Sequence, residues 1–173
     1  MNIELIELQG SEGEDVYEMI VEMGAGQNGF VNSLLSDTMD GFHALIKHNV
    51  QAAQGIGLAE GRVPQTVYVL YTDGKPVGYG KLRHCLNEKL RQHGGHIGYV
   101  IRPTARGQGY GAIILRELLR QAAAKNIPEV LLTCDESNTA SRRIIEGHLG
   151  RLTGLHEGVC QYWITLRDTE EQE

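Results

Sequence analysis

The chain has 173 residues, of which 41% are hydrophobic and 22% are charged, a balance that is ordinary for a folded globular protein. Its formal net charge of −6 at pH 7 argues against a nucleic-acid-binding surface, which needs a basic face. We therefore expect one domain over residues 1–166 and no nucleic-acid partner. The acidic tail, residues 167–173, is expected to be disordered.

The three cysteines, Cys85, Cys134 and Cys160, have no CxxC spacing, which favours a reducing compartment over a disulfide framework or a zinc site. His93 and His96 have no evident third ligand, so we expect no metal. The N-terminus lacks the basic segment and apolar run of a signal peptide, and no stretch approaches the ~20 apolar residues of a membrane span. These features predict a cytoplasmic protein without a membrane partner.

Hydrophobic periodicity predicts a first helix capped at Ser11, where Ser11-x-x-Glu14 forms a capping box, and a hairpin turn at Asp73-Gly74. The segment 24–36 reads as a loop that carries Phe30. In chain order the expected elements are strand 3–8, a helix ending at Gly24, a helix from Asp37 to Gly55, strands 66–72 and 76–84, strand 96–102, a helix ending near Asn126, strand 129–134, helix 138–148, and strands 151–155 and 159–166.

Three glycines, Gly107, Gly109 and Gly111, stand between strand 96–102 and an apolar helical pattern. A helix N-terminus offers unpaired N–H groups and a positive dipole end, so this loop is suited to phosphate. It lacks the Lys-Ser/Thr ending of a Walker A loop. The dinucleotide fingerprint G-x-G-x-x-G/A does fit residues 107–112, but only 38 residues follow Asp135, too few for that fold. A plain helix cap is the third interpretation.

A fourth interpretation covers nearly the whole chain. Arg106-x-x-Gly109-x-Gly111 matches the Gln/Arg-x-x-Gly-x-Gly/Ala motif of the GNAT superfamily of N-acetyltransferases, and residues 138–150 resemble that family's next segment. Residues 80–99 resemble a subset of predicted bacterial acetyltransferases of unassigned substrate. The resemblance implies an α+β GNAT fold. Its sheet is mixed but mostly antiparallel, with a central βαβ crossover over 96–134, splayed fourth and fifth strands, and helices on both faces.

The resemblance also implies acetyl-CoA as cosubstrate. Its pyrophosphate would lie on the glycine loop, its pantetheine arm would pair with strand 96–102, and a bulge at Gly98 would supply an N–H to the thioester carbonyl. Asn138 would hold the cofactor arm or serve only as a helix cap. The cofactor-binding residues implied in this way are Tyr99, Val100, Ile101, Arg106, Gly107, Gln108, Gly109, Tyr110, Gly111, Ala112, Asn138 and Ser141.

The implied reaction is direct attack of a primary amine, on a small molecule or a peptide, at the thioester. The tyrosine that often acts as acid in the fourth helix of the family is Ile145 here, so we consider His96 as base and Tyr162 as acid. The acceptor is expected to contact Asn28, Phe30 and Arg83. Lys81 and Arg83 would bind an acidic acceptor or form a solvated face. An acyl-CoA sensor with little catalysis is the alternative function, and a homodimer is the expected assembly.

Overall fold

The computed structural model describes residues 1–166, and the predicted disordered tail at 167–173 lies outside them. Nine strands and five α-helices are formed by the described residues. In chain order they are β1 (Ile3–Glu7), α1 (Glu14–Met23), β2 (Gly26–Gln27), β3 (Phe30–Val31), α2 (Met39–Ala52), β4 (Gln65–Thr72), β5 (Lys75–Arg83), α3 (Glu88–Gln92), β6 (Ile97–Ile101), a 3-10 turn (Pro103–Ala105), α4 (Tyr110–Ala124), β7 (Glu129–Asp135), α5 (Thr139–Gly147), β8 (Arg151–His156) and β9 (Val159–Thr165).

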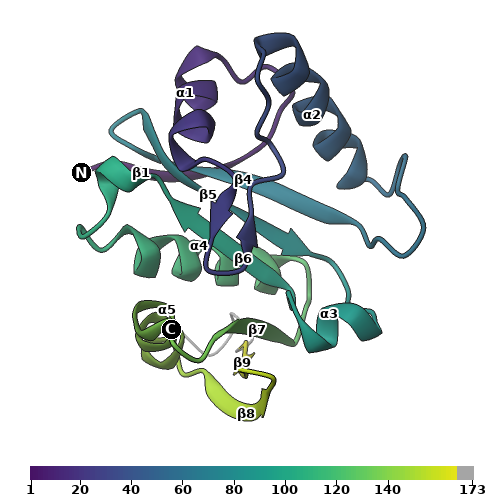
Figure 1. Cartoon of the computed structure of the whole chain (residues 1–173), viewed down its shortest axis with the longest axis vertical. Helices are drawn as coiled ribbons and strands as arrows, with labels where there is room; N and C mark the ends of the chain where they lie inside the picture. Colours follow the sequence, from purple (N-terminus) through teal and green to yellow (C-terminus); the bar gives the residue numbers. More distant parts are fainter. Residues whose placement is uncertain (167–173) are drawn as a thin grey trace.

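The larger sheet has the strand order β1-β4-β5-β6, and every neighbouring pair in it is antiparallel. The predicted turn at Asp73-Gly74 joins β4 to β5, with both residues at positive φ as a tight hairpin requires. Helices α1 and α2 lie on one side of this sheet and α4 lies on the other (Figure 1). Alternate strand residues feed two cores: Val69 and Tyr79 pack beneath α1 and α2, whereas Leu70 and Leu82 pack against α4.

The smaller sheet has the strand order β7-β9-β8 and is also antiparallel. It follows α4, which crosses from the end of β6 to the start of β7. Between β6 and β7 the backbone forms one hydrogen bond, from the His96 N–H to the Leu131 carbonyl at 2.8 Å. Beyond that point the strands belong to separate sheets, so the predicted splay is confirmed and leaves one edge of β6 open.

Three local expectations are wrong. Gly13, not Ser11, is the N-cap of α1 and no side chain caps it: the Glu12 carboxylate closes a turn ahead of the helix by accepting hydrogen bonds from the N–H groups of Gln9 and Gly10, and the helix begins after that turn. The segment around Phe30 is a short hairpin, β2–β3, rather than an irregular loop. Gly98 forms no bulge, since the β5–β6 register is continuous through it.

Candidate active site

A cavity of about 910 Å³ runs along the open edge of β6, from the glycine loop to the start of α3. Its walls come from the β2–β3 hairpin, β5, β6, the first turn of α4, the end of β7 and the start of α5. Of the residues predicted to bind the cofactor, all except Gln108 line it, and so do the predicted acceptor residues Asn28, Phe30 and Arg83. The structure therefore brings nearly all of these predicted residues to one cavity.

The glycine loop presents free backbone donors at one end of the cavity. Gly109 is the N-cap of α4 at φ 85°, a left-handed conformation that glycine adopts without strain. A Cβ there would meet no atom within 4 Å, so the space in front of the loop is open. Within residues 1–166, no protein acceptor takes the N–H groups of residues 107–112. This end of the cavity is built to hold an anion.

Arg106 braces this loop. Its Nε donates to the Ile101 carbonyl at 3.0 Å and its guanidinium donates to Gln27 Oε1 at 2.8 Å. The side chain therefore ties the end of β6 to the β2–β3 hairpin across the cavity. The sequence motif identified the residue, but its partner Gln27 lies 79 residues away and had no sequence signal.

The open edge of β6 is centred on Tyr99. The carbonyl oxygens of Gly98 and Val100 face β5, since a Cβ built on Gly80 or Gly78 would approach them at 3.3 and 2.6 Å. In an antiparallel strand the intervening residue faces the other way, so the N–H and C=O of Tyr99 are turned toward the gap between β6 and β7. A regular strand thus offers the backbone donor that a bulge was expected to supply.

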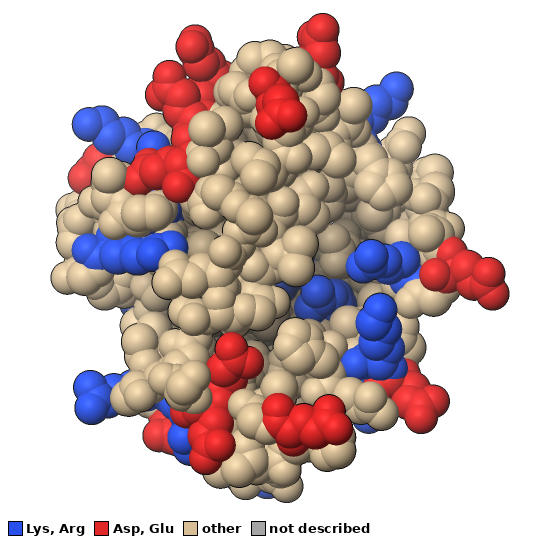
Figure 2. Space-filling model, viewed as in Figure 1, with Lys and Arg blue, Asp and Glu red and all other residues tan. Residues whose placement is uncertain are grey.

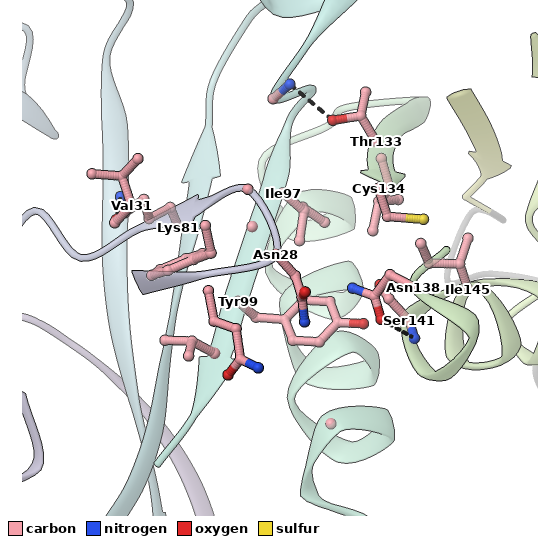
Figure 3. Close-up of a pocket in the computed structure, with 18 of the residues that line it drawn as sticks. Asn28, Val31, Lys81, Ile97, Tyr99, Thr133, Cys134, Asn138, Ser141 and Ile145 are labelled. Atoms are coloured by element: carbon pink, nitrogen blue, oxygen red, sulfur yellow. Dashed lines mark hydrogen bonds between the residues drawn. The ribbon is translucent and has the colours of Figure 1, made fainter. Parts of the chain in front are cut away.

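The Tyr99 side chain lies beneath this edge, with its hydroxyl directed toward Asn138 and Ser141 (Figure 3). The hydroxyl oxygen is buried and has no partner in hydrogen-bonding geometry within residues 1–166. Burial raises the pKa of Tyr99, and the nearby Ser141 hydroxyl only partly opposes that rise. The phenol is therefore protonated at neutral pH, and it is a proton donor without a protein acceptor.

The opposite wall comes from β7 and α5. The Asn138 side chain accepts from the Ser141 N–H at 3.2 Å, so Asn138 caps α5 while it also lines the cavity. Cys134 lines the same wall, and burial raises the pKa of its thiol to about 11. The thiol is thus protonated at neutral pH, and Cys134 packs as a small buried residue.

The β2–β3 hairpin covers the other side of β6. The Phe30 ring packs edge-on against Tyr79, with ring centroids 5.3 Å apart, and lies over Gly98. A buried network holds the hairpin in place: the Tyr79 hydroxyl donates to Asn32, and the Asn32 amide donates to the carbonyl oxygens of Ile20 and Gly24. Phe30 therefore plugs into the core and lines the cavity at once.

The two side chains considered for acid–base catalysis lie away from the cavity. His96 is buried, and its Nδ1 accepts the Leu131 N–H at 2.9 Å. Tyr162 is fully buried; its hydroxyl donates to Glu146 at 2.7 Å and accepts from Arg142 at 2.9 Å. Neither residue lines the cavity. Both side chains have structural partners, and we assign neither of them a role in catalysis.

The comparisons with known proteins agree with this geometry. The model of the acetyltransferase (GNAT) family matches residues 33–150, which is more than half of the sequence. The chain therefore belongs to the GNAT acetyltransferase family, and its glycine loop is that of an N-acetyltransferase rather than a dinucleotide-binding enzyme. No curated protein sequence matches this chain. No metal-binding cluster of His, Cys, Asp or Glu occurs among residues 1–166, and no helix there is long and apolar enough to cross a membrane.

Solved structures share the fold at low sequence identity. The N-acetyltransferase PseH of Campylobacter jejuni, in complex with acetyl coenzyme A, matches with a TM-score of 0.65 at 10% identity, over 96% of this chain and 100% of its own. The putative acetyltransferase yncA of Salmonella typhimurium, with its cofactor acetyl-CoA, has a TM-score of 0.63 at 14% identity, over 99% of this chain and 98% of its own. An acetyltransferase of Salmonella typhimurium that modifies the N-terminal serine of ribosomal protein L7/L12 has a TM-score of 0.68 at 15% identity, over 96% of each chain.

Proposed function

We propose that this protein transfers an acetyl group from acetyl-CoA to a primary amine by direct attack. The observation that carries the proposal is the set of unpaired N–H groups at residues 107–112, at one end of a cavity that continues along the open edge of β6. Two structures of the same fold hold acetyl-CoA, and a third relative acetylates a protein N-terminus. These are the cofactor and the kind of acceptor that the proposal assigns to this chain.

In this proposal the pyrophosphate of acetyl-CoA lies on the glycine loop, where the α4 dipole and the loop amides favour negative charge. The pantetheine arm pairs with the main chain of Tyr99 as an added strand. Asn138 and Ser141 contact the arm from the opposite wall. The thioester then lies near Gly98, between the cofactor end of the cavity and the hairpin end.

Chemistry follows in two steps. The amine nitrogen attacks the thioester carbon, forming the N–C bond, and its proton passes to water at the open mouth lined by the exposed residues Glu60 and His93. The C–S bond then breaks, the thiolate of CoA takes a proton from the Tyr99 hydroxyl, and the resulting phenolate regains, through water, the proton that the amine nitrogen released. This phenol replaces the acid that Ile145 cannot supply.

The test is release of CoA thiol from acetyl-CoA in the presence of a panel of primary amines. Amine-dependent release, with no release in the absence of amine, supports the enzyme. Tight binding of acetyl-CoA without turnover of any amine would favour the second candidate, an acyl-CoA sensor. That candidate is favoured by Ile145 at the usual position of the acid and by the structural partners of His96 and Tyr162.

A further inference from the structure

The half of the cavity beyond Gly98 is rich in cationic side chains. This half is lined by the cationic side chains of Arg62, Lys81, Arg83 and Lys89 and, within residues 1–166, by one carboxylate, that of Glu60. Figure 2 shows a hollow near the centre of this face, with Lys and Arg side chains beside it and most acidic groups toward the rim of the molecule. This concentration of positive charge occurs in a protein of net charge −6.

Lys81 is one of the few buried charged residues, with 6% of its surface exposed. Its Nζ donates to the Val31 carbonyl at 2.9 Å and lies 4.7 Å from the centre of the Phe30 ring. Neither contact supplies a negative charge. Burial, together with the like charges of Arg83 and Arg62, lowers the pKa of Lys81 to about 8. The site thus confines positive charges that destabilise one another.

Arg83 also lacks an acidic partner. One guanidinium nitrogen donates to the carbonyl oxygens of Gly94 and Gly95, both at 3.2 Å, and its other N–H groups have no acceptor within residues 1–166. The ion pairs found in that part of the chain involve Glu22 and Glu117, which do not line the cavity. Buried cations without a counter-ion are costly, so they are expected where a ligand supplies the anion.

Arg83 lies at the opposite end of β6 from the glycine loop, and Lys81 is paired with Gly98 in the middle of that strand. The Arg83 N–H donates to the His96 carbonyl, just before β6 begins, while the loop follows Ile101. The five steps of the chain from residue 96 to residue 101 span about 16 Å at the usual rise of a strand. Lys81 and Arg83 also share the face of Tyr79, beneath α1 and α2, whereas Tyr99 faces α4. The cations are therefore separate from the site proposed for the pyrophosphate.

We propose that the acceptor is an anionic amine, a small molecule that carries a carboxylate or phosphate group as well as its primary amine. Arg83 and Lys81 hold the anion from β5, and Arg62 attracts it at the mouth. An Arg guanidinium can donate two parallel hydrogen bonds to a carboxylate or to a phosphate. The inference rests on the proposed acetyl transfer. That reaction yields the N-acetylated anion and CoA thiol. Of the two protons that the ammonium group gives up, one ends on the thiol and the other is released to water.

The experiment compares amines in matched pairs, with CoA thiol release as the readout. γ-Aminobutyrate is paired with butylamine, and phosphoethanolamine with ethanolamine, so that each pair differs in the anionic group. Spermidine tests a cationic acceptor, and a short acidic peptide with a free N-terminus tests a macromolecular one. Calorimetric binding of the two anionic amines to the CoA-saturated protein gives a second readout that does not need turnover.

Variants then locate the anion. Arg62 is exposed, so Arg62→Glu keeps the fold while it reverses a charge at the mouth, and Arg83→Gln removes the partly buried guanidinium. Arg143→Glu is the matched control, because Arg143 is exposed and lies outside the cavity. We expect the anionic member of a pair to react at least tenfold faster in kcat/KM. We also expect Arg62→Glu to reduce that preference several-fold through KM, Arg83→Gln to reduce it more, and Arg143→Glu to leave it unchanged.

Several outcomes would overturn the inference and leave the proposed function standing: equal rates within pairs, faster reaction of spermidine or the peptide, or acetyl-CoA binding with no response to either anionic amine. If Arg143→Glu reduced the preference for the anionic amine as much as Arg62→Glu does, the preference would come from the overall charge of the protein rather than from the site. Failure to bind acetyl-CoA is distinguishable from all of these, because it removes the proposed function itself.

Discussion

His96 and Leu131 hold each other by two hydrogen bonds: the His96 N–H donates to the Leu131 carbonyl at 2.8 Å, and the Leu131 N–H donates to His96 Nδ1 at 2.9 Å. They join the two sheets at the point where β6 and β7 begin to separate. A second link, from the Gly94 N–H to the Thr133 hydroxyl at 2.8 Å, lies beside it. The cavity opens beyond this junction, so His96 helps to hold the two walls of the site in place.

Stability should therefore depend on the protonation of His96. Burial, with the charges of Arg91 and Arg83, lowers its pKa to about 4, well below that of an unfolded histidine. The unfolded chain binds a proton at this residue before the folded chain does, so stability is lost as pH falls from about 6.5 toward 4. His96→Asn keeps an acceptor for the Leu131 N–H without titrating. Chemical denaturation across this range should show a shallower decline for the variant, and parallel declines would contradict the assignment.

Tyr162→Phe should lower stability and leave turnover intact. The change removes the hydrogen bonds to Glu146 and Arg142, which costs about 1 kcal/mol in a typical protein. It leaves the cavity unaltered, since Tyr162 does not line it. Urea denaturation and CoA thiol release measure the two effects separately. A loss of turnover at unchanged affinity for acetyl-CoA would indicate instead that Tyr162 acts in catalysis.

Tyr99→Phe should lower kcat by about 10²-fold, as expected when a general acid is removed, while the affinity for acetyl-CoA stays within a few-fold. Its hydroxyl is buried, protonated and without a protein partner in the cavity. Tyr68→Phe is the control, because Tyr68 is also a buried tyrosine but lies in β4, away from the cavity. Steady-state kinetics with calorimetry makes the comparison. Full activity in Tyr99→Phe would mean that the thiolate leaves without this acid.

Lys81→Met should stabilise the protein at pH 7 by about 1–2 kcal/mol. A fall in pKa from 10.5 to about 8 corresponds to roughly 3 kcal/mol, partly offset by the lost contacts with Val31 and Phe30. The unfolded lysine stays protonated to higher pH, so the penalty is full below pH 8 and disappears as pH rises toward 10.5. Chemical denaturation should show a smaller difference in the free energy of unfolding between Lys81→Met and the wild type at pH 10 than at pH 7. A variant less stable than the wild type at pH 7 would contradict the account.

The sequence predicted the features that depend on local chemistry. The Asp73-Gly74 turn, the capping of α5 by Asn138 and the glycines before α4 each follow from the conformational preferences of a few neighbouring residues. The cap of α1 was misassigned because the Glu12 carboxylate closes a turn onto the N–H groups of Gln9 and Gly10, and the helix begins only after that turn. Local preference does not reveal which of two nearby polar side chains reaches the backbone.

The roles of His96, Tyr162 and Tyr99 depend on partners far along the chain and could not be predicted locally. His96 meets Leu131 across 35 residues, and Tyr162 in β9 meets Glu146 in α5 across 16 residues. For Tyr99 a signal was present. Because side chains alternate along a strand, Tyr99 shares a face with Ile97 and Ile101 and lies on the opposite face from Gly98. The two isoleucines are apolar, which indicates that α4 covers this face. That alternation would have directed the phenol toward α4 and α5.

Binding of acetyl-CoA to the glycine loop tests the central claim most directly, by calorimetry and by thermal unfolding with and without ligand. Gly109→Asp sets a carboxylate against the loop amides, and Gly158→Asp is the matched control. Both glycines have positive φ with nothing within 4 Å of a Cβ, but Gly158 lies in the β8–β9 turn outside the cavity. We predict that acetyl-CoA stabilises the wild type and Gly158→Asp and loses this effect in Gly109→Asp. No stabilisation of the wild type at millimolar acetyl-CoA, or equal stabilisation of all three proteins, would contradict the account.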